Sequence, residues 1–353
     1  MNTYETLQAR IRTQPKAWLV NGAAGFIGSH LVQTLLNLDQ AVTGLDNFST
    51  GKRENLDHVR RAVGEEKWKR MRFIEGDIRS LETCRDACAG ADLVLHQAAL
   101  GSVPRSIDDP IASTANNIGG TLNMLVASRD AGVGRMVYAS SSAVYGDHPA
   151  LPKLEPTIGR AVSPYGLTKH VNELYADVFA RCYGFHTIGL RYFNVFGPRQ
   201  APDGPYAAVI SAWIGALVRG LPAYVNGDGR AARDFCYVDN VVQANLLAAT
   251  TDSAAALNTA YNIAVGEQTS LLELFEMLRA LLTPRFPHLR AARPVHREER
   301  RGDVKYSKAD IGKAKRLLGY RPSHRIMDGL ERAIDWYVEA LVPAEIERKA
   351  VNA

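Results

Sequence analysis

The chain has no long apolar run, although 46% of its 353 residues are hydrophobic. No stretch approaches the roughly 18 consecutive apolar residues that a membrane-spanning helix needs. Residues 1–15 are polar and lack the apolar core of a signal peptide. We therefore expect a cytoplasmic protein that is neither secreted nor inserted in a membrane.

Cysteine is scarce, and clustered metal ligands are missing. The four cysteines are Cys84, Cys88, Cys182 and Cys236. They lie far apart except for one Cys-x3-Cys pair, and no histidine or cysteine cluster has the spacing of a metal site. We expect reduced thiols and no bound metal.

A basic stripe and internal repeats are absent as well. The net charge is +5, but arginine and lysine are scattered rather than interleaved with aromatic residues on one segment. Nucleic acid is therefore not an expected partner. A mildly basic enzyme acting on a diphosphate substrate explains the charge equally well. The absence of repeats excludes solenoid and propeller folds.

Short apolar runs alternate with helical patterns through the first half of the chain. The runs lie at 17–20, 41–45, 71–74, 92–95, 135–139 and 186–190. This alternation predicts βαβ units that form a parallel sheet covered on both faces. After about Asn194, proline- and glycine-rich segments broken by short helices predict a smaller lobe. The predicted fold class is α/β, a Rossmann-type doubly wound parallel sheet with a smaller C-terminal α/β lobe.

A glycine-rich turn follows the first predicted strand, with the sequence Gly22-Ala23-Ala24-Gly25-Phe26-Ile27-Gly28. Glycines at a strand-to-helix turn let backbone N–H groups approach a pyrophosphate at the helix N-terminus. A glycine motif alone is weak, because ordinary turns and helix caps also use glycine. In this context we predict a dinucleotide site that includes Gly22, Gly25, Phe26, Ile27 and Gly28.

Further cofactor candidates lie where the next strands end. Asp46 ends the second strand, where a carboxylate accepts hydrogen bonds from the adenosine ribose and repels a 2′-phosphate. This favours NAD over NADP, and a helix-capping aspartate is the alternative. The other candidates at strand ends are Asn47, Asp77, Ile78, Gln97, Ala98 and Ala99. His96 we interpret as a structural histidine.

The catalytic hypothesis rests on the segment Ser163-Pro164-Tyr165-Gly166-Leu167-Thr168-Lys169. Ser163 suits a helix N-cap and Pro164 the first helical position, so Tyr165 and Lys169 fall at i and i+4 on one face. Lowering a tyrosine pKa from near 10 to ~7 needs roughly 4 kcal/mol of phenolate stabilisation. Lys169, the helix N-terminus and a bound nicotinamide cation can supply it jointly. An exposed helix pair is the alternative.

A run of serines, Ser140-Ser141-Ser142, lies just past the fifth predicted strand. A hydroxyl there can relay a proton between a sugar hydroxyl and Tyr165, provided that it lies within hydrogen-bond reach. A serine-rich turn without a catalytic role is the alternative. The pattern leaves open whether Ser141 or Ser142 is the working hydroxyl.

Together these motifs resemble the extended short-chain dehydrogenase/reductase family. The resemblance covers the chain from about Lys16 to Tyr337 and rests on the glycine turn, Asp46, the Ser-Ser-Ser-x-x-Tyr-Gly segment at 140–146 and Tyr-x3-Lys. It implies bound NAD, with Tyr165 and Lys169 as catalytic residues. It also implies that Tyr192, in the segment 191–198, contacts the cofactor next to the substrate.

The same resemblance implies a set of substrate contacts. Asn194 would lie on the diphosphate side of a nucleotide sugar, and Tyr224 and Arg233 would belong to the uridine-binding region. Arg300 would bind the diphosphate, with Arg301 as a competing candidate. The forked donors of a guanidinium match phosphate oxygens.

Within the family, the chain is most similar to UDP-N-acetylglucosamine 4-epimerases that serve bacterial polysaccharide synthesis. The similar segments are 100–106, 145–149 and 206–210. The likeness implies a wall of small residues facing the 2-substituent of the sugar, formed by Gly101, Ser102, Ala208 and Ser307, with Val209 beside it. Galactose-specific relatives have a large aromatic residue at the position of Ser307.

Two departures from related patterns bear on the reaction. Nucleotide-sugar 4,6-dehydratases carry Thr-Asp-Glu where this chain has Ser141, Ser142 and Ala143. The missing acidic pair argues against dehydration. Members of the epimerase subgroup usually have one more serine, at the position of Ala143.

The resemblance therefore implies a 4-epimerase that interconverts UDP-GlcNAc and UDP-GalNAc through a 4-keto intermediate, supplying polysaccharide, O-antigen or lipopolysaccharide synthesis. The alternatives are a UDP-glucose or UDP-GlcNAc-uronate 4-epimerase, or another NAD-dependent UDP-sugar oxidoreductase or decarboxylase. We expect an NAD-binding domain at 1–193 and a UDP-sugar-binding domain at 194–353, with some segments returning to the first. We also expect a homodimer through helices at 165–175 and 118–131, although apolar helix faces fit an ordinary core as well.

Overall fold

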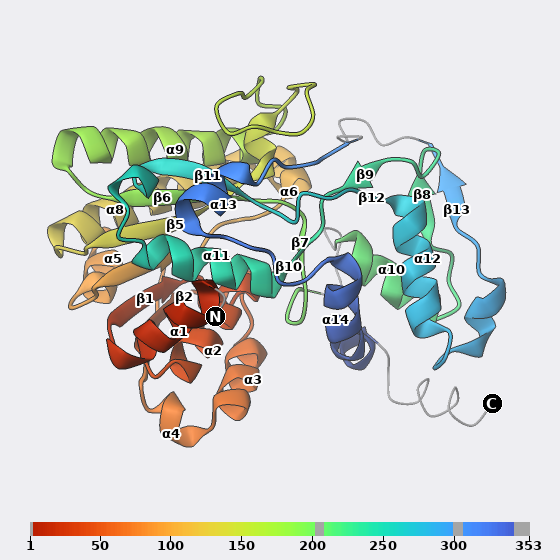
Figure 1. Ribbon diagram of the computed structural model, residues 1–353, viewed down its shortest axis with the longest axis horizontal. Helices are drawn as coiled ribbons and strands as arrows, with labels where there is room; N and C mark the ends of the chain where they lie inside the picture. The colour runs from red at the N-terminus through yellow and green to blue at the C-terminus, as the bar shows by residue number, and fades with distance from the viewer. Residues whose placement is uncertain (1–2, 202–207, 299–305, 342–353) are drawn as a thin grey trace.

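The centre of the molecule is a seven-stranded parallel sheet (Figure 1), in a computed structural model that describes residues 3–201, 208–298 and 306–341. Its strands are β1 (Ala17–Asn21), β2 (Ala41–Asp46), β3 (Met71–Glu75), β4 (Leu93–His96), β5 (Arg135–Ser141), β6 (Thr187–Tyr192) and β11 (Thr259–Ile263). They lie in the order β11-β6-β5-β4-β1-β2-β3, and every neighbouring pair is parallel. The strand order reverses between β1 and β4, so the sheet is doubly wound, as predicted.

The six strands predicted from the apolar runs are all present, with small shifts at their ends. The sequence predicts them because central parallel strands are buried on both faces and are therefore continuous apolar runs. Every residue of β4 and β6 is buried. The edge strand β11 was not predicted. It joins the sheet beside β6 although it comes after residue 193.

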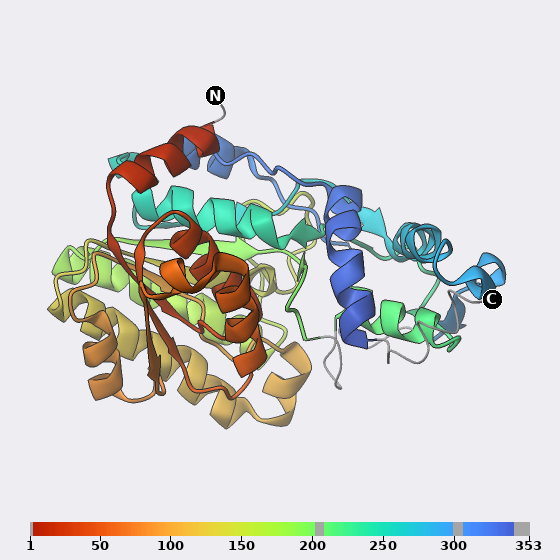
Figure 2. The ribbon, with the colours of Figure 1, turned by 90° about the horizontal axis from the view of Figure 1, so that it is seen from below.

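Helices cover both faces of the sheet. One face carries α1 (Thr3–Thr13), α2 (Phe26–Asn37), α3 (Arg53–Val63), α4 (Glu65–Trp68), α11 (Val238–Thr250) and α13 (Gly312–Leu318). The other carries α5 (Leu81–Cys88), α8 (Gly120–Asp130) and α9 (Pro164–Tyr183), next to α6 (Val103–Asp108), α7 (Pro110–Thr114) and the π-helical turn at Ala115–Gly119. Figure 2 shows α11 (teal) and α8 (yellow-orange) on opposite sides of the sheet. Each layer buries its own apolar cluster against the strands.

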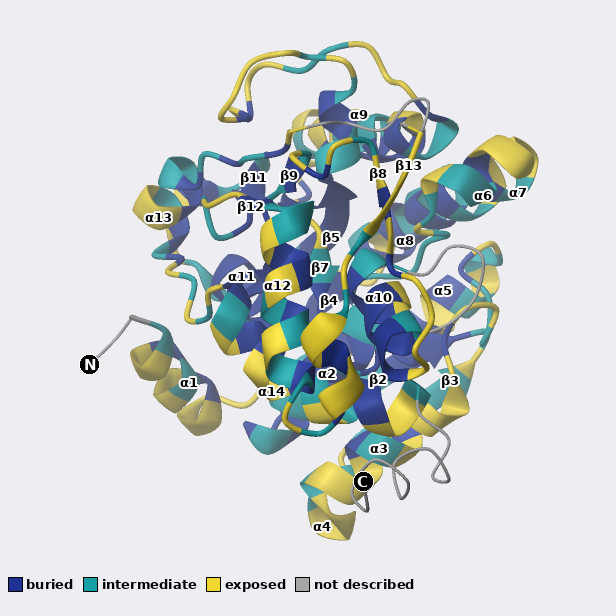
Figure 3. Ribbon diagram, turned by 90° about the vertical axis from the view of Figure 1, so that its right-hand side faces the viewer, coloured by how far each residue is buried: buried dark blue, intermediate teal, exposed yellow. Residues whose placement is uncertain are grey.

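The smaller lobe has a separate hydrophobic core. Its helices are α10 (Val209–Val218), α12 (Leu271–Leu282) and α14 (Ile326–Leu341), which pack around Trp213, Phe275 and Tyr337. Figure 3 faces this lobe and shows the buried and exposed sides of α12. Three two-stranded sheets accompany it: β8 (Tyr224–Asn226) with β13 (Val295–Arg297), β9 (Ala232–Arg233) with β12 (Thr269–Ser270), and β7 (Val195–Phe196) with β10 (Cys236–Tyr237). Short 3₁₀ turns lie at Ser142–Tyr145, Ala254–Ala256 and Pro287–Ala291.

Segments after residue 193 contribute to both parts of the molecule. β11 extends the sheet, α11 packs across β4, β5 and β6, and α13 packs on β11. We keep residue 193 as a proposed division between cofactor and substrate binding rather than as a boundary between separate cores. Within the ranges that the structure describes, no helix is long and apolar enough to cross a membrane.

Candidate active site

A cavity of about 1110 Å³ lies at the carboxyl end of the sheet, where the strand order reverses, and reaches the smaller lobe. Open α/β sheets bind their ligands at this crossover point. The glycine turn, the ends of β2, β4, β5 and β6, and the start of α9 line the cavity from the sheet side. Ala208, Arg233 and Ser307 line it from the other. Most of the predicted site residues therefore come together here.

The glycine turn is shaped by close backbone contacts that a side chain would prevent. Gly22 has φ +71°, and a Cβ there would lie 2.7 Å from the backbone nitrogen of Ala98. A Cβ on Gly28 would lie 2.0 Å from the carbonyl oxygen of Gly22. The helix α2 begins at Phe26, so its first N–H groups and its positive dipole end face the cavity. This arrangement fits a dinucleotide pyrophosphate.

Asp46 lies at the end of β2, lines the cavity and is buried. One of its oxygens accepts the backbone N–H of Ala24 at 2.9 Å, and the other accepts that of Phe48 at 2.8 Å. The carboxylate thus belongs to the glycine turn rather than to a helix cap. Burial raises its pKa, and the backbone hydrogen bonds oppose that rise. A carboxylate offers about four acceptor positions, so Asp46 can still accept a hydrogen bond from a ribose hydroxyl.

Three predicted cofactor residues do not line this cavity. Asn47 donates from Nδ2 to Oδ2 of Asp77 at 2.9 Å. Asp77 in turn pairs with Arg79, whose hydrogen bonds lower the pKa of that carboxyl to about 2. Ile78 is buried in the core and packs against Gly120. Asn47, Asp77 and Ile78 therefore stay proposed cofactor contacts next to this lining.

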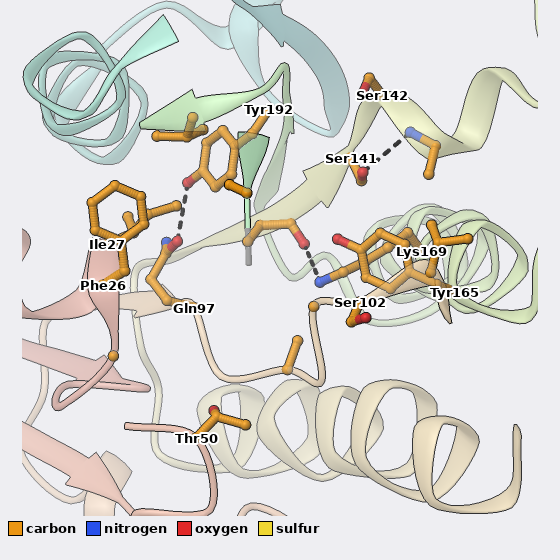
Figure 4. Close-up of a pocket in the computed structure, with 18 of the residues that line it drawn as sticks. Phe26, Ile27, Thr50, Gln97, Ser102, Ser141, Ser142, Tyr165, Lys169 and Tyr192 are labelled. Atoms are coloured by element: carbon orange, nitrogen blue, oxygen red, sulfur yellow. Dashed lines mark hydrogen bonds between the residues drawn. The ribbon is translucent and has the colours of Figure 1, made fainter. Parts of the chain in front are cut away.

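The end of β4 contributes Gln97, Ala98 and Ala99 to the lining. The side chain of Asn21 holds this turn, because its Oδ1 accepts the backbone N–H of Gln97 and of Ala98. Tyr192 donates its hydroxyl to Oε1 of Gln97 at 3.2 Å (Figure 4). His96 is fully paired with Asn21 and Thr121, and burial lowers its pKa to about 3. It is a neutral structural histidine, as expected.

Tyr165 and Lys169 both line the cavity from the first turns of α9. The predicted cap is present: the hydroxyl of Ser163 accepts the backbone N–H of Gly166 at 3.1 Å, and Pro164 begins the helix. The ammonium of Lys169 donates to the carbonyl of Ala139 at 2.7 Å and lies 5.9 Å from the centre of the Tyr165 ring. Figure 4 shows both side chains on the side of the cavity opposite Phe26, Ile27 and Gln97.

The ionisation of this pair is set by burial. Burial lowers the pKa of Lys169 to about 8, and the nearby Glu173 opposes the change. Burial raises the pKa of Tyr165, and a hydrogen bond with Ser141 opposes that rise. The lowered tyrosine pKa that the sequence led us to expect is therefore not a property of the chain alone. It requires positive charge from a bound cofactor in addition to Lys169.

The three serines have different surroundings. Ser140 donates to Oε1 of Glu173 at 2.5 Å. Ser141 ends β5, interacts with Tyr165 and accepts the backbone N–H of Ala143 at 3.1 Å. Ser142 begins the next 3₁₀ turn and also lines the cavity. The geometry favours Ser141 as the hydroxyl next to Tyr165.

The predicted substrate residues fall into three groups. Those that line the cavity are Gly101, Ser102, Asn194, Ala208, Arg233 and Ser307, together with Ser141 and Ser142. Val209 begins α10 one residue beyond the lining, and Tyr224 lies on β8 under the guanidinium of Arg297. Arg300 and its competitor Arg301 lie outside the described residues.

Sequence reasoning missed several residues of the lining. Lys153 is buried and donates to the carbonyl of His148. Arg199 is buried against α2 through His30 and Gln33, and burial lowers its pKa to about 10. Both residues lie in irregular segments, where no helical or strand periodicity in the sequence points to a site. Only Arg199 has a local signal in the sequence, because it directly follows the segment 191–198.

Comparison with known proteins agrees with this fold and with NAD as the cofactor. Residues 18–264 match the NAD dependent epimerase/dehydratase family. The UDP-glucose 4-epimerase of Mycolicibacterium smegmatis is 33% identical over 321 residues, which cover 90% of this chain and 97% of that protein. The chain belongs to the NAD dependent epimerase/dehydratase family, and its cofactor is NAD.

Two solved structures show how widely substrates vary among similar proteins. The UDP-N-acetylglucosamine 4-epimerase of Methanobrevibacter ruminantium, in complex with UDP-N-acetylmuramic acid, has a TM-score of 0.84 and 34% identity, covering 92% of this chain and 99% of that one. The UDP-glucuronic acid 4-epimerase of Bacillus cereus, in complex with UDP-glucuronic acid and NAD, has a TM-score of 0.80 and 32% identity with the same coverage. These two proteins are both named as 4-epimerases and differ in the sugar.

Proposed function

We propose that this chain is a UDP-N-acetylglucosamine 4-epimerase, which interconverts UDP-GlcNAc and UDP-GalNAc. The observation that carries the proposal is the small-residue wall of the cavity. Gly101, Ser102, Ala208 and Ser307 all line it, and Ser307 is buried there. Small side chains leave volume beside the sugar for an N-acetyl group. A supply role in polysaccharide or O-antigen synthesis belongs to the same proposal.

The chemistry assigned to the chain is proton transfer at the sugar's 4-hydroxyl. Tyr165, as phenolate, takes the proton, and Ser141 bridges the transfer. Lys169 is held by the carbonyl of Ala139, which leaves two of its three N–H donors for the nicotinamide ribose and the phenolate side. Bound NAD would supply the hydride acceptor and donor for carbon 4 of the sugar.

Epimerisation requires a firm grip on UDP and a loose grip on the hexose, because the 4-keto sugar must turn over between the two hydride transfers. We assign the firm grip to Asn194 and Arg233, with Arg300 as a further candidate. Asn194 is held in place by donating from Nδ2 to the carbonyl of Asp234 at 3.2 Å. The small wall gives the hexose room to turn.

Dehydration of the sugar is the less favoured reaction. It needs an acid and a base beside the substrate to eliminate water. Ser141, Ser142 and Ala143 occupy the relevant lining positions. Among the described lining residues, the carboxylates are Asp46 at the glycine turn and Asp108 on α6.

One observation favours a second candidate, a UDP-GlcNAc-uronate 4-epimerase. Lys153 is a buried residue of the cavity lining, and its ammonium donates to the carbonyl of His148. A carboxylate on the sugar would supply a charge opposite to that of this ammonium.

The substitution Ser307→Tyr tests the carrying observation. A large ring should displace the N-acetyl group, so kcat/KM for UDP-GlcNAc should fall about tenfold or more relative to that for UDP-glucose. Ser307→Ala, which keeps the wall small, is the matched control and should leave the ratio unchanged. An unchanged ratio in Ser307→Tyr would contradict the assignment of this wall.

We also propose a homodimer. Exposed apolar residues gather on α9 (Leu167, Leu174 and Val178) and on α6 and α7 (Ile107 and Ile111). The helix α8, which the sequence paired with α9, buries Met124 and Leu125 in the core and remains a second candidate for the interface. The proposed interface is therefore α9 with α6 and α7.

A further inference from the structure

The catalytic helix α9 carries a third charged residue in line with Tyr165 and Lys169. Glu173 follows at i+8 and i+4, so it lies on the same helix face. Its Oε1 accepts from the hydroxyl of Ser140 at 2.5 Å and from Nε of Arg191 at 2.9 Å, and its Oε2 accepts from Nη2 of Arg191 at 2.7 Å. The side chains of Arg191 and Glu173 are 6% and 11% exposed.

The partners of Glu173 are themselves neighbours across two strands. Ser140 on β5 and Arg191 on β6 stand opposite each other in the parallel register. Side chains alternate between the two faces of a strand. The adjacent pair, Ser141 and Tyr192, lines the main cavity, and Ser140 is also part of that lining. One carboxylate therefore fastens the helix that carries Tyr165 to the two strands that carry Ser141 and Tyr192.

We propose that Glu173 is a positioning residue for this site, because it ties α9 to β5 and β6 and presents its negative charge to Lys169. The proposal rests on the proposed epimerase function for its catalytic consequence. The contact between Glu173 and Ser140 lies close to Lys169. The ammonium of Lys169 donates to the carbonyl of Ala139, which precedes Ser140 on the same strand.

The charges around Lys169 make Glu173 its main electrostatic neighbour. On its own helix it faces Glu173 and the neutral ring of Tyr165. From β4 it faces His96, whose pKa is lowered to about 3, so that ring is neutral. Beside Glu173 lie Arg191, Tyr138 of β5 and Lys313 of α13. Burial alone lowers the pKa of Lys169, and the charge of Glu173 keeps it protonated to higher pH.

Glu173 and Arg191 do not line the main cavity, so their proposed role is to position the residues that do. Both line a second cavity, of about 360 Å³, together with Tyr138, Glu155 and Lys313. Neither is part of the lining of the main one. Any effect of a substitution at Glu173 on turnover is therefore expected to pass through α9, β5 and β6 or through the charge that Glu173 presents to Lys169.

The test is Glu173→Gln, which keeps the shape and removes the charge. The titration of Lys169 is followed by NMR of ¹³C-labelled lysine side chains, with Lys169→Arg identifying its signal. We expect the pKa of Lys169 to fall and the alkaline limb of kcat to move to lower pH. On that limb, kcat should be about tenfold lower for every pH unit by which the limb moves.

Asp177→Asn is the matched control, because Asp177 lies one turn further along α9 and pairs with the exposed Arg181. It should leave both the lysine titration and the pH profile at wild-type values.

A Lys169 titration in Glu173→Gln that matches wild type would overturn the proposal. The buried Arg191 left without its partner can prevent folding. In that case the double variant Glu173→Gln/Arg191→Met, which removes both charges, is measured in place of Glu173→Gln. A Lys169 titration that matches wild type would again overturn the proposal. The NMR readout requires no turnover. If the chain has no epimerase activity, the proposed function is wrong, and the NMR titration still tests the role of Glu173.

Discussion

Burial shifts the pKa values of Tyr165 and Lys169 in opposite directions. Burial favours the neutral form of each, so it raises the tyrosine pKa and lowers the lysine pKa to about 8. A phenolate and an ammonium together are what proton transfer from a sugar hydroxyl requires. The chain favours that state through the hydrogen bond of Ser141 and the charge of Glu173, and we expect bound NAD to supply the rest.

The lysine sets the pH dependence that we predict for turnover. Because its folded-state pKa is near 8, Lys169 loses its proton as pH rises through about 8, and kcat should fall there. The contribution of Lys169 to the stability of the fold changes in the opposite direction and rises as the pH increases. An unfolded chain keeps this proton up to its ordinary value of 10.5, so the cost of burying the charge is present below pH 8 and disappears between 8 and 10.5. A pH profile of kcat checks the first point, and a kcat that is constant or rising through that range would contradict it.

The glycine turn is the element on which cofactor binding depends. Gly28→Ala places a methyl group against the carbonyl of Gly22, where a Cβ would lie at 2.0 Å, so the start of α2 must move. We expect a loss of about 1–3 kcal/mol of stability and loss of NAD from the purified protein. Nucleotide released on denaturation measures the second effect.

Gly119→Ala is the control for this substitution, because a Cβ on Gly119 meets nothing within 4 Å. It should keep its NAD. Retention of NAD at the wild-type level in Gly28→Ala would show that the pyrophosphate does not rest on this turn.

Elements with a local sequence pattern were predictable, and elements defined by distant contacts were not. The buried central strands, the glycine turn and the capped start of α9 each show in a few consecutive residues. β11 is a short strand that pairs with β6 across a long insertion, so no local pattern places it in the sheet. The same reason hid the partnership of Glu173 with Ser140 and Arg191, which spans three elements. The pairing of Asp77 with Arg79 was likewise not predicted from its position at a strand end.

At the scale of the whole molecule, the active site belongs to both lobes. Strand β2 supplies Asp46, helix α9 supplies Tyr165 and Lys169, and the segments after residue 193 supply Arg233 and Ser307 to the lining. Ser307 is held in this wall because its backbone N–H donates to the carbonyl of Ala232 at 3.0 Å. This joint construction explains how one scaffold can keep its hydride chemistry while the sugar it accepts changes from protein to protein.

The proposed dimer is tested by a charge placed on its surface. Leu174 is 52% exposed on α9, and Leu174→Glu should shift the protein from dimer to monomer in analytical ultracentrifugation. Leu221→Glu, at a leucine 55% exposed in the smaller lobe, is the control and should remain dimeric. A monomeric wild type, or a dimer unaffected by Leu174→Glu, would exclude this interface.

The most direct measurement incubates the purified protein separately with UDP-GlcNAc, UDP-glucose and UDP-GlcNAcA and identifies the products by NMR. The proposed function predicts UDP-GalNAc from UDP-GlcNAc, with the fastest turnover of the three and no net formation of NADH. Conversion of UDP-glucose or UDP-GlcNAcA alone, or stoichiometric NADH, would contradict it.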